Sequence, residues 1–248
     1  MLINQVRVAN EVIFFAKDLM RKWNISPYTD INKPCLFFGV YSENDVKVIK
    51  NHKGLKIVWF TNHDTKNLIN HFIGVDDLVV NYTAGLSIPE GVKYKKTSIA
   101  IKDFSSFTPT PLGDKIYCYI GNGHIGNKHG YPIVKEIEKL VNFEIIYGKL
   151  GNSLDYIKEN YYNKSFININ ITESGRSGLT TLTEMGFMGR YSISNTKDDF
   201  PCVIRYNNIE DIVNIINLES KKIGTSQPSL LENHFYNSNE WKNIDFWL

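Results

Sequence analysis

The first third of the chain alternates between apolar residues at helical spacing and short unbroken apolar runs. Residues 8–23 place an apolar side chain at every third or fourth position, which predicts an amphipathic helix. Helices are also expected at 44–50 and 65–72. Three short apolar runs predict buried strands, at 35–38, 56–60 and 78–80. Strands that alternate with helices are typical of a parallel sheet with crossover helices.

The second half of the chain repeats this alternation. Strands are predicted at 116–120, 143–147, 166–171, 191–194 and 203–204, and helices at 131–141, 154–161, 180–188 and 209–221. Prolines and glycines concentrate between the halves, at 88–113, which predicts a domain boundary there. We therefore expect two doubly wound domains that face a cleft, over residues 1–112 and 113–225, and a tail helix over 226–248 that packs on the domains.

Composition narrows the class of protein. A hydrophobic content of 42% over 248 residues is sufficient for packed cores and excludes wholesale disorder. A net charge of +2 argues against binding driven by bulk positive charge. Cys35, Cys118 and Cys202 are isolated in apolar runs and fit no zinc motif, so buried thiols are expected. Without a signal-peptide pattern or a membrane-length apolar run, a cytoplasmic location is expected.

A loop rich in glycine and serine follows the predicted strand at 166–171 and precedes a helix. Backbone N–H groups at such a helix start bind phosphate, and Arg176 would add a charge-assisted contact. The carboxylate of Glu184, about one turn into the helix, would accept hydrogen bonds from a ribose. An ordinary capped turn is the alternative interpretation. The candidate nucleotide-binding residues here are Glu173, Ser174, Arg176, Gly178, Leu179, Thr180 and Glu184.

A second glycine-rich loop, at 121–126, follows the first strand of the C-terminal half. Gly123 and His124 are its candidate phosphate contacts, and Tyr147 on the next strand is a further candidate. The spacing is that of a dinucleotide-binding fingerprint, but the helix starts late and the acid about twenty residues on, Glu144, falls within a strand. An NAD-linked oxidoreductase therefore remains a minor alternative.

In the N-terminal half, His63 and Asp64 follow the strand at 56–60. Either is a candidate base for activating an acceptor hydroxyl, although Asp64 also suits a helix N-cap. A small basic cluster, Lys93, Lys95 and Lys96, lies beside Tyr94. With Phe104 and Phe107 it would suit a nucleic acid acceptor. No cluster of His, Cys and carboxylates has metal spacing, so no metal is expected.

The run from Glu184 to Gly189 resembles the donor-site motif of GT-B fold glycosyltransferases of the retaining, glycogen-synthase-like group. In that family a glycine-containing loop precedes a helix whose Glu is followed by small residues and a short strand. The family's two Glu residues are separated by seven others, and here Arg176 holds the position of the first. The resemblance covers roughly residues 115–224. The chain is also similar to small glycosyltransferase-like proteins of phages and large viruses, through the runs 37–41 and 51–54.

This resemblance implies a GT-B-like α/β fold with two Rossmann-like domains, the nucleotide-sugar donor being bound by the C-terminal one. It implies a hexosyl- or pentosyltransferase that moves a sugar from a nucleotide diphosphate-sugar, UDP-sugar foremost, to an acceptor hydroxyl without a further cofactor. A viral origin would make a hydroxymethylated DNA base a candidate acceptor. A surface or capsid glycan is the alternative acceptor, and a non-catalytic nucleotide-binding protein is the alternative function.

Overall fold

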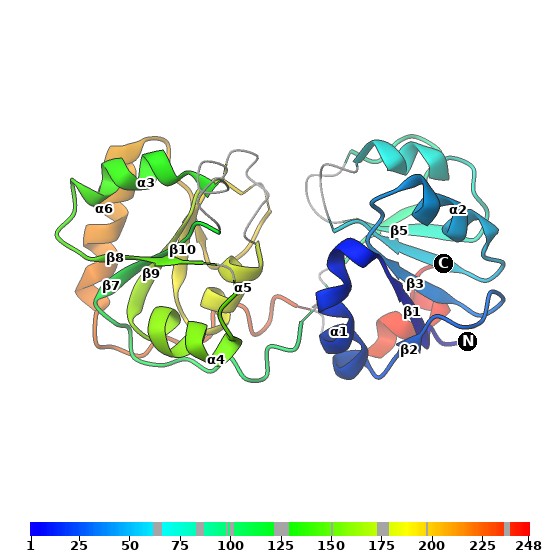
Figure 1. Ribbon diagram of the computed structural model, residues 1–248, viewed down its shortest axis with the longest axis horizontal. Coiled ribbons are helices and arrows are strands. Elements are labelled where there is room, and N and C mark those ends of the chain that lie inside the picture. Colours follow the sequence, from blue (N-terminus) through cyan, green and yellow to red (C-terminus); the bar gives the residue numbers. More distant parts are fainter. Residues whose placement is uncertain are drawn as a thin grey trace. The chain divides into compact units, whose positions relative to one another are not determined.

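The computed structural model divides the chain into two compact units, each described here by itself (Figure 1). The first unit consists of Met1–Asp103 with Phe235–Leu248, and the second of Phe104–His234. The structure describes residues 1–61, 66–82, 87–97, 99, 102–121, 129–149, 151–172, 179–196, 198–235 and 239–248.

The first unit is built on a six-stranded parallel sheet in the order β2-β1-β3-β4-β5-β6. Its strands are β1 (Gln5–Val8), β2 (Ser26–Pro27), β3 (Cys35–Phe38), β4 (Lys56–Trp59), β5 (Leu78–Tyr82) and β6 (Tyr94–Lys96). Its helices are α1 (Ala16–Trp23), α2 (Glu43–Asn51) and the 3-10 helices η1 (Asn10–Phe15) and η2 (Lys66–Phe72). Strand order reverses between β1 and β3, which makes this the switch point of the sheet.

The predicted helix over 8–23 is wrong in its first half. Val8 ends strand β1, and the α-helix begins only at Ala16. Between them η1 contains Val12 at φ −124°, which is outside helical geometry. Val8 therefore lies on a strand and Val12 is buried in a kinked turn, so their helical spacing is coincidental.

The second unit has a five-stranded parallel sheet in the order β11-β10-β9-β7-β8, with its switch point between β7 and β9. Its strands are β7 (Lys115–Tyr119), β8 (Ile145–Gly148), β9 (Ser165–Asn170), β10 (Tyr191–Ser194) and β11 (Val203–Ile204). Its helices are α3 (Tyr131–Glu138), α4 (Leu154–Ile157) with the π-helical turn η5 (Lys158–Tyr162), α5 (Leu179–Phe187), and α6 (Ile209–Glu219) with the 3-10 turn η6 (Ser220–Lys222). The predicted α/β class with two parallel sheets is confirmed.

The two faces of this second sheet differ in chemistry. One face packs an isoleucine-rich core, including Ile116 and Ile167, against α3 and α6. On the other face Tyr117, Asn168 and Ser192 lie side by side on adjacent strands, and Asn168 Nδ2 donates to Ser192 Oγ at 2.9 Å. All three are buried, so the α4 and α5 side of the sheet has a polar interior (Figure 1).

The chain passes from one unit to the other between Asp103 and Phe104, whereas the sequence suggests a boundary at 112/113. The tail is divided as well. Leu231 is buried in the second unit beside Gly186, and Trp241 packs edge-on against Trp23 in the first. The last described residues form two 3-10 helices, η7 (Asn239–Lys242) and η8 (Ile244–Phe246), in place of the predicted tail helix.

Two general expectations can be compared with the structure. All three cysteines are buried as free thiols, and burial raises the pKa of each to about 12. Within the described part of the chain, no helix is both long and apolar enough to cross a membrane.

Candidate functional site

The two predicted phosphate loops leave neighbouring strands on either side of the second sheet's switch point. Strands β7 and β9 pair directly, with Cys118 opposite Ile169. The predicted loops include residues 122–128, which follow β7 in the sequence, and residues 173–178, which follow β9. Ligands of doubly wound sheets bind beyond the carboxyl ends of the strands at such a point. The candidates Gly123, His124, Glu173, Ser174, Arg176 and Gly178 lie in these loops, outside the described residues.

The helices that follow these loops have no acidic side chain in their first turns. α3 begins Tyr131-Pro132-Ile133 and α5 begins at Leu179, followed by two threonines. By contrast, α2, α4 and α6 each have at least one acidic residue in the first turn. An acid in the first turn interacts with the positive end of the helix dipole and with its unpaired N–H groups. In the described first turns of α3 and α5 no side chain supplies this internal anion, which favours an anionic ligand at both.

The loop after β7 ends against the last residues of the β9 segment. Gly130, the N-cap of α3, has φ +68°. A Cβ on it would lie 2.7 Å from the carbonyl oxygen of Ile171. Both the backbone angle and the close approach therefore require glycine at this position.

Sequence reasoning missed Asn195, which fixes the backbone where the second loop begins. Its Oδ1 accepts from the N–H of Thr172 at 3.0 Å, and its Nδ2 donates to the Thr172 carbonyl at 2.6 Å. A single side chain thereby joins the segment after β10 to the segment after β9. The sequence gives little sign of this role, because Asn195 and Thr172 are 23 residues apart. The one hint is that Asn195 directly follows the strand predicted at 191–194.

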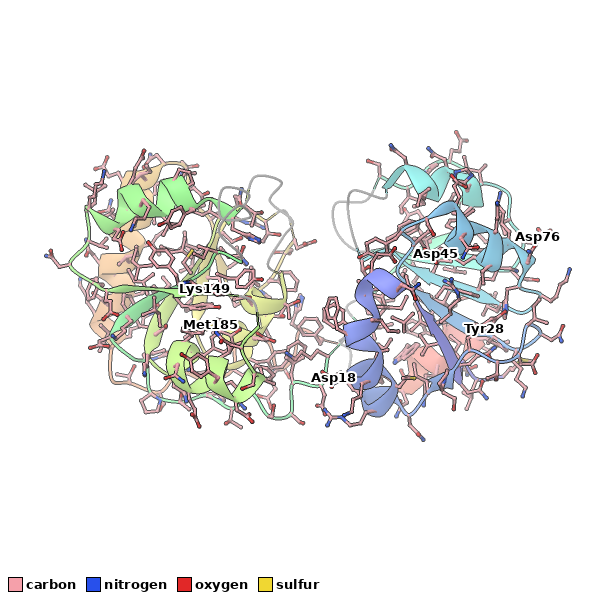
Figure 2. All side chains as sticks on the ribbon, viewed as in Figure 1. Asp18, Tyr28, Asp45, Asp76, Lys149 and Met185 are labelled. Atoms are coloured by element: carbon pink, nitrogen blue, oxygen red, sulfur yellow. The ribbon has the colours of Figure 1, made fainter. Side chains whose placement is uncertain are left out.

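The structure places Glu184 in the interior of the second unit. Glu184 is 5% exposed, and the hydroxyl of Tyr162 donates to its Oε2. Burial, followed by the charge of Glu184, raises the pKa of Tyr162 well above its usual value. Met185, the next residue of α5, is also fully buried (Figure 2). Contact of Glu184 with a ribose stays a prediction. Its test has to distinguish a loss of nucleotide binding from a loss of stability caused by the missing contact with Tyr162.

Leu179 is the first described residue of α5, and the side chains of two other candidates, Tyr147 and Thr180, are described. Tyr147 lies on β8, where its ring packs edge-on against Tyr131 of α3 at 5.7 Å and lies near the ammonium of Lys135. Burial raises its pKa. Thr180 is half-buried in the first turn of α5, and its carbonyl accepts from Thr183 Oγ1 at 2.8 Å. Thr180 thus lies next to the predicted phosphate loop, whereas Tyr147 packs on the helix that covers the opposite, apolar face.

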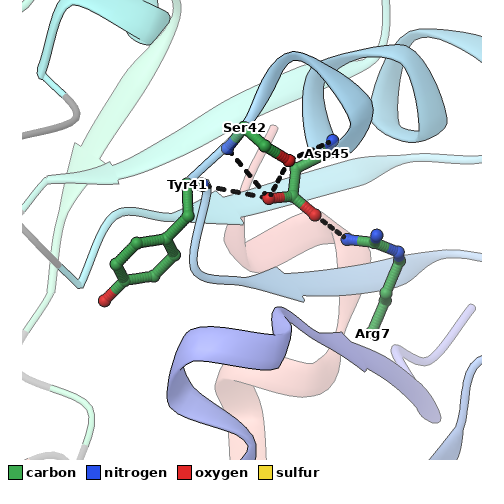
Figure 3. Close-up of polar contacts among 4 residues, drawn as sticks. All are labelled: Arg7, Tyr41, Ser42 and Asp45. Atoms are coloured by element: carbon green, nitrogen blue, oxygen red, sulfur yellow. Dashed lines mark hydrogen bonds and ion pairs between the residues drawn. The ribbon is translucent and has the colours of Figure 1, made fainter.

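At the switch point of the first unit an internal carboxylate takes the place that a bound anion would take. Asp45 Oδ2 accepts from the N–H groups of Tyr41 and Ser42 and from Ser42 Oγ, at 3.0 to 3.1 Å, and its Oδ1 pairs with Arg7 at 2.8 Å (Figure 3). Burial alone would raise the pKa of Asp45, but these donors hold it below its usual value. The donors at the start of α2 are therefore already engaged.

The predicted base candidates His63 and Asp64 lie outside the described residues. The residue before them, Thr61, is described. Its Oγ1 lies 2.9 Å from the hydroxyl of Tyr41, so this contact links the segments that follow β3 and β4.

The predicted cluster of basic and aromatic residues is wrong for Phe104 and Phe107, whereas Tyr94 on β6 is exposed. Phe104 and Phe107 are buried in the second unit, where Phe104 stacks on Phe187 at 4.3 Å. Lys95 belongs to the first unit and donates to the carbonyl of Phe246. Buried rings cannot stack on nucleic acid bases, because that requires an exposed ring face. Among the described residues, no group of three His, Cys, Asp or Glu side chains is arranged to hold a metal ion.

Comparisons with known proteins bear on the fold. No protein-family model matches the sequence, and no curated protein matches it. A crystal structure of a glycosyltransferase from Rickettsia africae ESF-5 superposes with a TM-score of 0.51 at 14% identity, over 96% of this chain and 81% of that one. The fold is GT-B-like. MurG of Acinetobacter baumannii gives a TM-score of 0.42 at 12% identity, over 96% and 77% of the two chains. At such identities the likeness concerns the fold alone.

Proposed function

We propose that this chain is a glycosyltransferase that moves a sugar from a nucleotide diphosphate-sugar to an acceptor hydroxyl. The observation that carries the proposal is the position of the two glycine-rich loops. They leave adjacent strands at the switch point of the second sheet and lead into α3 and α5, whose first turns hold no acid. The GT-B-like fold supports it.

In this proposal the second unit holds the donor diphosphate between the starts of α3 and α5. Arg176 and the N–H groups of both loops would stabilise the negative charge that develops on the leaving diphosphate as the bond to the anomeric carbon breaks. Glu184 would accept from the ribose. In an inverting reaction His63 or Asp64 would take the proton of the acceptor hydroxyl, whose oxygen forms the new bond. UDP is the proposed nucleotide carrier.

The first unit is proposed to hold the acceptor. The start of α2 has its own carboxylate, Asp45, on donors that a phosphate would otherwise use. A second nucleotide at this switch point would have to displace the partly buried ion pair of Asp45 with Arg7. The first turn of α2 holds a carboxylate, and the described first turns of α3 and α5 hold none. This difference favours one nucleotide per chain, in the second unit.

The first experiment is a thermal melt of the protein with UDP, GDP, ADP and dTDP, their sugar conjugates and NAD. A ligand at a hundred times its dissociation constant stabilises a protein by about 2.7 kcal/mol. That corresponds to a rise of several degrees in melting temperature for a chain of this size. We expect this rise with one nucleoside diphosphate and its sugar conjugate, UDP foremost.

A Glu184→Gln variant tested in the same melt separates its two roles. If Glu184 contacts the ribose, the nucleotide raises the melting temperature of the variant by less than it raises that of the wild-type protein. If Glu184 only packs against Tyr162, the melting temperature of the ligand-free variant falls, and the rise caused by the nucleotide equals that of the wild-type protein. A rise with NAD alone would support the oxidoreductase, and no rise with any ligand would contradict the proposed function.

The acceptor class can be distinguished by the salt dependence of transfer. We expect transfer to vary little with salt, as for a glycan acceptor, because two of the three aromatic residues proposed to stack on bases, Phe104 and Phe107, are buried. A protein that neutralises several phosphates loses orders of magnitude in affinity between about 50 and 200 mM salt. Transfer to hydroxymethylated DNA with such a steep loss would overturn this expectation and support a DNA base as acceptor.

A further inference from the structure

The hydroxyl of Thr172, near the switch point of the second sheet, has no hydrogen-bond partner in the described part of the chain. Thr172 is two residues beyond the end of β9 and is 2% exposed. Among the residues that the structure describes, none forms a hydrogen bond with its Oγ1. A buried hydroxyl without a partner costs free energy, and such groups call for an explanation by a ligand, a water molecule or strain.

The position of Thr172 separates it from the other orphaned atoms among the described residues. His52 Nε2, Asn81 Nδ2 and Trp241 Nε1 belong to the first unit, and Tyr147 and Asn168 lie within strands. Thr172 alone follows a strand at the edge where ligands of doubly wound sheets bind. It also directly precedes the loop at 173–178.

The backbone of Thr172 is held independently of its side chain. Both its N–H and its carbonyl are paired with the side-chain amide of Asn195, which is an exposed residue. The neighbouring Ile171 is in contact range of Gly130 at the start of α3. The hydroxyl is therefore carried by a fixed backbone, one residue after the contact with the start of α3 and seven residues before Leu179, where α5 begins.

We propose that Thr172 Oγ1 donates a hydrogen bond to a phosphate oxygen of the bound nucleoside diphosphate, and that Asn195 is the residue that positions it. This inference rests on the proposed function and adds a binding residue and a positioning residue to the same site. A hydrogen bond to a charged oxygen accounts for about a 10- to 100-fold change in affinity.

The test compares Thr172→Val with the wild-type protein by isothermal titration with UDP, GDP, ADP and dTDP. Valine has nearly the same shape and lacks the hydroxyl. Removal of an unpaired buried hydroxyl should leave the melting temperature of the ligand-free protein unchanged or higher. Nucleotide affinity should fall about 10- to 100-fold, and Thr172→Ser, which keeps the hydroxyl, should retain most of it.

Asn195 is tested by a double-mutant cycle. Asn195→Ala should weaken nucleotide binding in the wild-type background, and much less when residue 172 is already valine, because both changes remove the same contact. Equal losses in both backgrounds would mean that Asn195 does not act through the Thr172 hydroxyl.

The outcomes separate this inference from the function on which it rests. If the wild-type protein binds a nucleotide and Thr172→Val binds it equally well, the hydroxyl pairs with water only and the inference is overturned, while the proposed function stands. If Thr172→Val lowers the melting temperature of the ligand-free protein, the hydroxyl has an internal partner and the inference also fails. If the wild-type protein binds none of the four nucleotides, both proposals fail.

Discussion

Replacement of Arg190 by methionine is expected to lower the free energy of unfolding of the second unit by more than about 3 kcal/mol. The side chain of Arg190 is fully buried, and it donates to the carbonyls of Ser165, Thr110, Pro111 and Met188 and to the Thr110 hydroxyl. Burial lowers its pKa to about 10, so it remains charged at pH 7. Methionine would fill much of the space but donates to none of these oxygens, which would stay buried without partners.

The measurement can isolate the second unit, because all four tryptophans of the chain belong to the first. Tryptophan fluorescence in urea therefore reports the first unit, and far-UV circular dichroism reports both. The Arg190→Met variant should lose part of its dichroism at lower urea while the fluorescence midpoint moves little. Arg205→Met is the matched control, since Arg205 is exposed and donates to the Asp198 carbonyl at 2.7 Å. Its effect should be within about 0.5 kcal/mol, and equal midpoints for the two variants would contradict the role of Arg190.

The sequence is most informative in the second unit. All five strands are predicted close to their observed positions, because each is a short segment of apolar or alternating apolar and polar residues between predicted loops and helices. Parallel pairing of neighbouring strands then brings the loops at 122–128 and 173–178 to the same edge of the sheet. This much of the candidate site follows from local pattern and the rules of doubly wound sheets.

The first strand of the chain could not be predicted in the same way. β1 has four residues, and only Gln5 and Val6 are buried, so it offers no apolar run. Its partners β2 and β3 supply the hydrogen bonds that make it a strand. With β1 misassigned, neither the switch point of the first unit nor the ion pair of Arg7 with Asp45 can be found from the sequence.

Burial of the polar candidates was also beyond the sequence. Glu184 stands at a helix position that is compatible with either the surface or the interior. Glu184 is buried because it pairs with Tyr162, 22 residues earlier, on the polar face formed by Tyr117, Asn168 and Ser192. A polar residue on a strand is ordinarily assigned to the solvent side. Here α4, η5 and α5 cover that side, so three-dimensional packing reverses the assignment.

The second large effect is expected at Asp45. Replacement of Asp45 by alanine should lower the free energy of unfolding of the first unit by about 2 to 4 kcal/mol. The change removes the capping box at the start of α2 and leaves Arg7 without its carboxylate. The side chains of Arg7 and Asp45 are only 21% and 6% exposed, so water replaces these contacts poorly. Tryptophan fluorescence in urea measures the loss directly, because Trp23 and Trp59 lie in the same unit.

A change of pH gives the same interaction a second, independent readout. The donors around Asp45 hold its pKa in the folded protein below the unfolded value of about 3.9. The stabilisation is therefore complete above about pH 4 and is lost as pH falls through the folded pKa, since the unfolded chain then binds the extra proton. The difference between the wild-type protein and Asp45→Asn should shrink across this range. Asp211 is the matched control, because it accepts from Asn207 in the corresponding position of α6. Asp211→Asn should cost about 1 kcal/mol or less, and an equal cost at both sites would mean that Arg7 adds nothing to the cap.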